Sequence, residues 1–433
     1  MTVKAEAAPY VEAYRAQPRP ADEPRWLAER REAALRNFGD KGFPTRRQEA
    51  WRFTDLRPLQ RAPLPPTAGG AVARQALDTY RLAGAAHRLV FVNGRFSPEL
   101  SAVGALPKGA WLAPTTRTLA ERPDIAAGAI DETDTVGAQP FASLNAALFT
   151  DGFVLSLEAG VCLDHPIEII HLGRAEAPCS LHLRNLVALG AGSRASLIES
   201  YAGEGAYWTN AVTVAKLGER ADFTAVKLQD EGADAIHFAV TRARLAAAAR
   251  YDSFAFTLGA RLSRHETLAT LDGENAQLGL NGAYLLRGTQ EATNATFVDH
   301  AAPGGVTREL FKGVVENRAH GVFLGSISVR PEAQKTDARQ LNKNLLLSPR
   351  ATVDTKPELE ILADDVKCSH GATVGDLDES ALFYLRARGI PEAEARRMLI
   401  EAFAADAIDT VENPALRGHL ARHLARWLAH SGV

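Results

Sequence analysis

A thiol and an imidazole lie two residues apart in the segment Lys367-Cys368-Ser369-His370-Gly371. Residues two apart on a β-strand face the same side, so the Cys368 thiolate and the His370 ring would reach one metal ion together. Both side chains are ligands of zinc and of iron–sulfur centres. The alternative is a buried cysteine beside a structural histidine, and the bare Cys-x-His pattern does not choose between them.

Three other groups of residues are weaker candidates. Cys162 and Cys179 lie near three histidines at spacings that match no metal motif, and we interpret these histidines as surface or ladder residues: His165, His171 and His182. Asp299 and His300 precede a turn and would suit acid–base chemistry in a loop, but adjacent residues seldom point at each other, so a structural role is favoured. Trp51, flanked by charged residues, is either an interface anchor or, by preference, a local packing residue.

The sequence lacks the motifs of a self-sufficient enzyme. Three cysteines without a Cys-x-x-Cys pair exclude a zinc ribbon or an independent four-cysteine cluster. If metal is bound, this chain supplies one or two ligands and another molecule supplies the rest. There is no P-loop, no Gly-x-Ser-x-Gly and no His-Glu-x-x-His motif, so we expect no nucleotide on this chain.

Composition and charge fit a soluble protein of 433 residues, long enough for two or three domains. The formal charge of only −3 offers no basic field for nucleic acid. The sequence contains no stretch of about 18 uncharged apolar residues, so we predict no membrane-spanning helix. Residues 1–20 lack the continuous apolar run of a secretory signal. We therefore expect a cytoplasmic protein without nucleic-acid or membrane partners.

Residues 166–361 alternate apolar and polar side chains over short runs. A weak repeat of a turn, a small residue and alternating positions recurs after 26, 30, 25, 19, 24 and 32 residues. Its units start at Arg194, Arg220, Arg250, Asn275, Asn294, Arg318 and Arg350. Spacings of roughly 20–30 residues predict a β-solenoid, whereas a β-sandwich has turns about every 8–12 residues. Because the repeat lacks hexapeptide regularity, we predict an irregular, right-handed parallel β-helix.

Helical patterns flank this mainly β region. Before it we predict a helix over 24–38, an exposed connector over 58–70, and a strand over 89–92 that enters a tight turn at Asn93 and Gly94. The predicted parts are an N-terminal helical and mixed region (1–150), a β-helix core (151–375) and a C-terminal helical domain (376–433).

Three helices are predicted in the C-terminal domain, the first over 379–388 and the others opened by Pro391 and by Pro414. The expected apolar face of the second helix is Ala395, Met398, Leu399, Ala402, Phe403, Ile408 and Val411. That of the third is Leu416, Leu420, Leu424, Trp427 and Leu428. Such helices either cap the open edge of a solenoid or dock a partner, and the pattern leaves both open.

Several runs strongly resemble the SufB/SufD family of iron–sulfur cluster assembly proteins. The densest match spans about 341–411 and includes the run ADDVKCSHGATVG at 363–375. The runs at 42–54 and 91–94 match as well, so the resemblance covers nearly the whole chain. Three cysteines and the Cys-Ser-His form favour the SufD branch over the SufB branch.

The resemblance implies a right-handed parallel β-helix with helical parts on both sides. It also implies a complex with a SufB-like paralogue and a SufC-like ABC-type ATPase, which would dock on the C-terminal helices and bind the ATP. Cys368 and His370 would lie at the SufB interface and offer transient ligands to an iron–sulfur cluster or its iron, His370 being the stronger candidate. Arg308 departs from the small polar residue expected there. A homodimer in isolation stays open.

Two other functions are consistent with a β-helix. A carbohydrate-active enzyme would need two carboxylates converging on a groove, and no convincing acid pair is present. A purely structural platform would tolerate substitution of Cys368 and His370 without loss of function.

Overall fold

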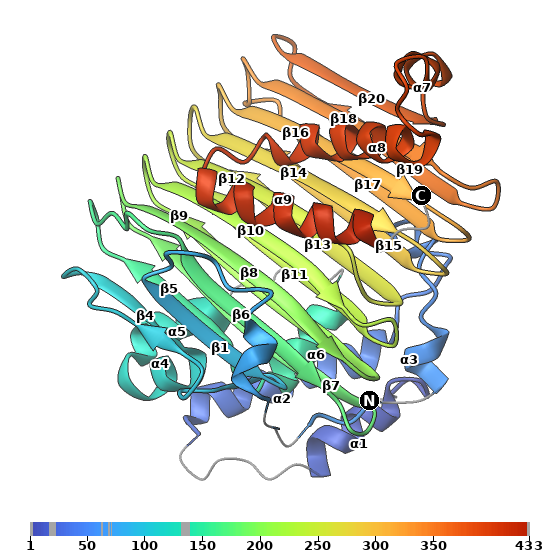
Figure 1. Ribbon diagram of the computed structural model, residues 1–433. Coiled ribbons are helices and arrows are strands. Elements are labelled where there is room, and N and C mark those ends of the chain that lie inside the picture. The colour runs from blue at the N-terminus through green and yellow to red at the C-terminus, as the bar shows by residue number, and fades with distance from the viewer. Residues whose placement is uncertain are drawn as a thin grey trace.

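The computed structural model describes residues 3–16, 23–61, 64–67, 70, 72–130 and 139–430, and its centre is a parallel β-helix of about eight coils (Figure 1). One sheet contains β1 (His87–Val92), β2 (Arg95–Phe96), β3 (Ala102–Val103), β6 (Ile167–Arg174), β8 (Arg194–Glu204), β10 (Asp222–Glu231), β12 (Arg250–Thr257), β14 (Gln277–Leu286), β16 (Val306–Val315), β18 (Asp337–Leu346) and β20 (Lys367–Gly375). We call it the even sheet. The facing odd sheet contains β4 (Ala110–Pro114), β5 (Phe153–Leu157), β7 (Cys179–Leu189), β9 (Tyr207–Leu217), β11 (Ile236–Leu245), β13 (Leu262–Leu271), β15 (Glu291–His300), β17 (His320–Val329) and β19 (Thr352–Ile361). The predicted fold class, a solenoid core with helical flanks, is confirmed.

Successive coils stack in register. Strands β10, β12 and β14 begin at Asp222, Arg250 and Gln277, and these three residues pair with one another across the even sheet, so one coil takes 27 or 28 residues here. Side chains of both sheets fill the space between them. Phe223 and Tyr251, for example, stack with ring centroids 5.5 Å apart. Each coil buries its apolar face only against its neighbours, which is why the coils are stable as a stack.

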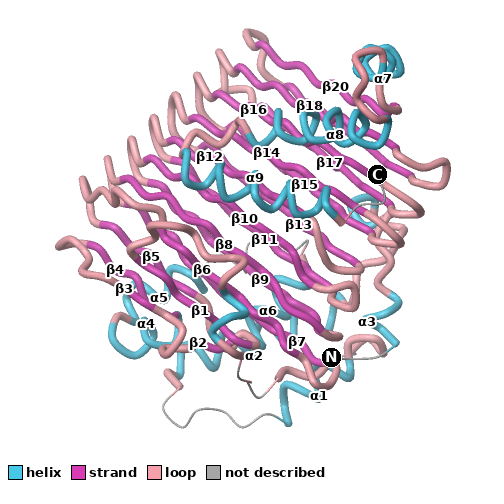
Figure 2. The backbone as a smooth tube through the Cα atoms, viewed as in Figure 1, coloured by secondary structure: helices cyan, strands magenta, loops and turns pink. Residues whose placement is uncertain are grey.

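A column of turn residues with positive φ angles leads each coil back to the even sheet, and Figure 2 shows the turns stacked along the edges of the coils. Gly192, Arg220, Ala248 and Asn275 have φ angles of 65°, 54°, 54° and 59°. The backbone N–H of each donates to a carbonyl oxygen of the next coil at 2.7–2.9 Å. A small buried residue follows each of them: Ser193, Ala221, Ala249 and Ala276. Two predicted units, Arg220-Ala221 and Asn275-Ala276, coincide with this column, whereas the units predicted at Arg194 and Arg250 start two residues too late, on the first residues of β8 and β12.

The predicted repeat changes sheet after Asn275, which is a correction. Asn294 lies in the middle of β15, and Arg318 and Arg350 precede strands of the odd sheet. Asn317, before β17, also has a positive φ angle of 58°. Because both edges of the β-helix use turns of this kind, the sequence pattern alone does not separate them.

N-terminal helices cover the outer face of the odd sheet. They are α1 (Ala8–Ala16), α2 (Arg25–Lys41), α3 (Arg57–Arg61), α4 (Thr115–Glu121), α5 (Pro123–Ile130) and α6 (Pro140–Leu148), with a short 3-10 turn at Glu49–Trp51. A second 3-10 turn, Arg74–Leu77, instead packs Leu77 against β1 and β6 of the even sheet. Tyr10, Phe38 and Phe141 from this region pack against Trp208 and Phe238 of the sheet. The N-terminal region is thereby fixed to the middle coils.

Two N-terminal predictions are confirmed and one is wrong in part. The predicted helix over 24–38 is α2, which runs on to Lys41 and ends where Gly42 adopts a φ angle of 65°. The turn at Asn93 and Gly94 joins β1 to β2 as predicted. The prediction of an exposed connector over 58–70 is wrong in part, because 57–61 forms α3 and Pro66 bridges to β7; Pro63 and Gly69 lie outside the described residues.

The C-terminal helices are α7 (Glu379–Arg386), α8 (Glu392–Ile408) and α9 (Pro414–Ala429). Figure 1 shows α8 and α9 across the outer face of the even sheet, where they share a buried cluster with β10, β12 and β14. They cover this face rather than the open end. The predicted apolar face of α9 is buried, but α8 turns Met398 and Ala402 outward and buries Ile400, Ala404 and Ala407 instead. Among the described helices, none is long and apolar enough to cross a membrane.

Replacing Asn413 with alanine should lower the free energy of unfolding by about 1 kcal/mol. The Asn413 Oδ1 atom accepts hydrogen bonds from the backbone N–H groups of Ala415 and Leu416, at 3.0 and 3.3 Å, and so caps α9. Urea denaturation measures the loss. Asn413→Asp keeps the acceptor and should stay within about 0.5 kcal/mol of the parent; an equal loss in both variants would contradict a capping role.

Candidate functional site

Cys368 and His370 lie on β20, the last strand of the even sheet. β20 pairs only with β18, with Cys368 beside Ala338 and His370 beside Gln340. The last strand of the odd sheet, β19, likewise pairs only with β17. These two strands form the open end of the β-helix, near α7 in Figure 1. Ile361, Leu362 and Val374 at this end are exposed apolar residues. The predicted strand position of both candidate residues is thus found at an unpaired edge.

Both candidate side chains are on the inner side of β20. Cys368 is half-buried and packs against the core between the sheets. His370, two residues on, shares that side but is exposed because no further coil covers it. Burial, with a smaller contribution from the charge of Asp337, raises the pKa of the Cys368 thiol. Within the described ranges, no three His, Cys, Asp or Glu side chains are grouped to hold a metal ion, so no third ligand of these types lies beside Cys368 and His370 there.

A buried carboxyl group lies beside Gln340, on the strand of the preceding coil. Glu309 of β16 is 4% exposed and pairs in register with Gln340. Its Oε2 atom accepts hydrogen bonds from the Thr296 hydroxyl at 2.9 Å and from Gln340 Nε2 at 3.0 Å. Burial raises the pKa of Glu309 to about 7, although both hydrogen bonds oppose the shift. Neither Glu309 nor Gln340 was a predicted site residue.

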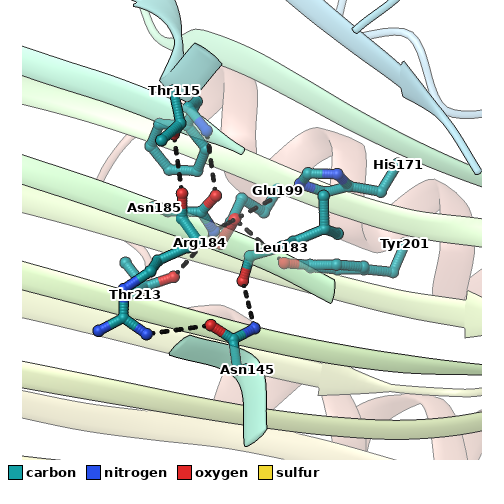
Figure 3. Close-up of polar contacts among 10 residues, drawn as sticks. Thr115, Asn145, His171, Leu183, Arg184, Asn185, Glu199, Tyr201 and Thr213 are labelled. Carbon is teal, nitrogen blue, oxygen red and sulfur yellow. Dashed lines mark hydrogen bonds and ion pairs between the residues drawn. The ribbon is translucent and has the colours of Figure 1, made fainter. Parts of the chain in front are cut away.

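A cluster of polar side chains lies between the sheets, nearer the N-terminal end of the β-helix, around Glu199 of β8 (Figure 3). Glu199 Oε1 accepts hydrogen bonds from Asn185 Nδ2 and from the Tyr201 hydroxyl, each at 3.2 Å, and His171 Nε2 lies 3.7 Å away. Burial lowers the pKa of nearby Lys227 to about 8, against the attraction of Glu199 and Glu231.

His165, His171 and His182, the three histidines near Cys162 and Cys179 in the sequence, lie on different elements. His165 is exposed, and His171 stacks on Tyr201 with centroids 4.5 Å apart inside the even sheet. His182 lies on the odd sheet beside Asn210, and burial lowers its pKa to about 3. Cys162 is exposed and Cys179 is buried.

Asp299 and His300 are at the end of β15 rather than in the predicted loop, because the strand continues to His300. They face opposite sides. The Asp299 carboxylate binds the Arg330 guanidinium outside, and the His300 ring lies 2.9 Å from the Thr307 hydroxyl inside, where burial lowers the pKa of His300 to about 4. The preferred structural reading is consistent with these contacts.

Trp51 and Arg308 both have packing partners. The Arg264 guanidinium lies 3.9 Å from the centre of the Trp51 ring, and Phe141 and Phe238 surround it, so Trp51 is a local packing residue. Arg308, the departure noted in the sequence, binds the Asp337 carboxylate at 2.7 Å and joins β16 to β18 on the outer face.

Comparison with known proteins identifies the family. The model described as "SUF system FeS cluster assembly, SufBD core domain" matches residues 171–403, more than half of the chain. The chain belongs to the SufBD family. The model of the SufBD N-terminal region matches residues 82–169, directly before the core.

Full-length relatives carry the SufBD assignment across both regions. An iron–sulfur cluster assembly SufBD family protein of Synechocystis is 34% identical over 91% of this chain and 89% of its own length. The iron–sulfur cluster assembly protein SufD of Escherichia coli is 32% identical over 87% of each chain. A chloroplastic protein of Arabidopsis thaliana is 30% identical over 88% of this chain and 82% of its own length. The predicted family and its iron–sulfur assembly role are therefore confirmed.

Proposed function

We propose that this chain is a non-catalytic scaffold subunit that pairs with a SufB-like paralogue and offers His370, with Cys368, as transient ligands to a nascent iron–sulfur cluster. The observation that carries the proposal is the open end of the β-helix, where β19 and β20 have unpaired edges and Cys368 and His370 face inward on the last strand. Unpaired edges beside exposed apolar residues favour the addition of strands from another chain.

An incomplete ligand set suits this role. A cluster held by four ligands of one chain would be difficult to pass on, whereas one or two ligands from each side release it when the two chains separate. Separation would come from a SufC-like ATPase, for which we propose α7 as part of the docking surface. None of the side chains of α7 is buried, and Phe383 and Tyr384 are 73% and 55% exposed.

Replacing His370 with alanine should reduce cluster formation by about 10-fold or more, because even residues that only support a metal ligand contribute 10- to 100-fold. The complex itself should still assemble. The chain is co-purified with its paralogue and ATPase, and iron and sulfide are counted after anaerobic reconstitution.

Ser369→Ala is the matched control, since Ser369 lies between the two candidates and faces the other side of β20. It should leave both assembly and cluster yield unchanged. Full cluster yield in the His370→Ala complex would reject the ligand role and leave the purely structural platform as the better description.

A further inference from the structure

Four residues form one column on the inner side of the even sheet. Leu280, Glu309, Gln340 and His370 pair successively across β14, β16, β18 and β20. Neighbouring strands of a sheet are about 4.8 Å apart and paired residues face the same side. The side chain of Gln340 therefore lies between a buried carboxyl group and the exposed imidazole of His370.

Glu309, on the neighbouring strand β16, orients the Gln340 amide. The Gln340 Nε2 atom donates to Glu309 Oε2 at 3.0 Å, and an ionised carboxylate, which only accepts, keeps this end of the amide facing it. The Gln340 Oε1 atom is then directed elsewhere. It is buried and has no hydrogen-bond partner among the described residues. A buried acceptor without a donor is unfavourable, so this oxygen is available to a donor that comes within reach.

The opposite sheet leaves room for this amide. A Cβ atom placed on Gly325 of β17 would lie 2.1 Å from Gln340 Nε2 and 2.5 Å from its Cδ atom. The absence of a side chain at Gly325 thus lets Gln340 extend across the interior to its observed position.

We propose that Gln340, held by Glu309, is the positioning residue of His370. The structure does not hold this contact: it forms when the exposed His370 side chain turns one ring N–H toward the unpartnered Gln340 Oε1 atom, and the other ring nitrogen then keeps its lone pair for iron at the open end. Histidine ligands of metals commonly donate their second N–H in this way, which fixes the tautomer and the direction of the ring. The inference rests on the proposed ligand role of His370 and extends it to two buried residues.

The test compares the imidazole ¹⁵N shifts of His370 in the full-length parent chain and in Gln340→Met, which keeps the length of the side chain but removes the acceptor. The parent should show shifts typical of a single neutral tautomer, and Gln340→Met should move both shifts toward the averaged values of a free imidazole. Arg339→Met, on the outer face of the same strand, is the matched control and should change nothing. Glu309→Gln keeps an oxygen that accepts from Gln340 and should retain the parent shifts.

Two results would overturn the inference: averaged shifts in the parent chain, which needs no variant to fold, or unchanged shifts in Gln340→Met. In the complex, Gln340→Met should reduce cluster yield by about 10- to 100-fold. A normal yield in His370→Ala together with shifted resonances in Gln340→Met would reject the ligand role and keep the positioning contact. A lost yield in His370→Ala with no effect of Gln340→Met would do the reverse.

Discussion

Replacing Arg264 with methionine should lower the free energy of unfolding by about 3–5 kcal/mol. Arg264 of β13 is 1% exposed, and its side chain lies between the odd sheet and the N-terminal region. Its Nε atom donates to Glu266 Oε1 at 2.6 Å, its Nη1 atom donates to the Thr54 hydroxyl at 3.2 Å, and its guanidinium covers Trp51. Methionine fills much of the space but leaves the buried Glu266 carboxylate without its cation.

Chemical denaturation of the full chain measures this loss, and two further variants test its cause. The double variant Arg264→Met/Glu266→Gln removes both charges and should recover a large part of the stability, since the penalty comes from an uncompensated buried charge. Arg330→Met breaks the exposed pair with Asp299 and should change stability by at most about 1 kcal/mol. Equal losses from Arg264→Met and Arg330→Met would contradict the argument.

The stability of the folded chain should fall by about 3 kcal/mol through Glu309 as the pH rises from 4.5 to above 7. Burial raises the pKa of this carboxyl group from 4.5 to about 7, and the two side chains that donate hydrogen bonds to it, Thr296 and Gln340, are both neutral. Below pH 4.5 the group is protonated in both the folded and the unfolded chain. Between 4.5 and 7 only the unfolded chain releases the proton, which favours unfolding. Above the folded pKa the penalty is constant.

Glu309→Gln isolates this contribution. The variant has no proton to release at this position, while buried histidines such as His182 and His300 titrate equally in both proteins. The difference in unfolding free energy between parent and variant should therefore shift by about 3 kcal/mol against the parent across this pH range. A difference that stays constant from pH 4.5 to 8 would show that Glu309 has an ordinary pKa.

The sequence predicted the coils because some of their turns have a chemical signature. Arg220-Ala221 and Asn275-Ala276 combine a left-handed turn residue with a buried alanine, and the pattern follows from that geometry. Ala248 adopts the same conformation without any residue-type signal. Asn294-Ala295 resembles a turn but lies inside β15. Coil edges could thus be predicted approximately, whereas the sheet to which each unit belongs could not. The boundaries 1–150, 151–375 and 376–433 stay predictions.

The sequence predicted only the part of the candidate site that lies on one strand. Cys368 and His370 alternate within nine residues of continuous β20, so a local pattern was enough. Gln340 and Glu309 lie near these two residues only because β16, β18 and β20 pair side by side. Coil length varies along the chain, so no fixed spacing in the sequence indicates that Glu309, Gln340 and His370 are neighbours. A buried Glu in an alternating strand also looks like any solvent-facing residue. Only the register across β16, β18 and β20 distinguishes the buried Glu309 from a glutamate that faces solvent.

The direction of the hydrogen bonds in the turn column bears on how the chain folds during its synthesis. The N–H of Gly192 donates to the carbonyl of Glu219, that of Arg220 to Ala247, and that of Asn275 to Pro303, always about one coil later in the chain. On a ribosome, each turn must therefore wait for about one further coil to emerge before its donor finds an acceptor. Folding from the N-terminus would therefore trail translation by about one coil along this column.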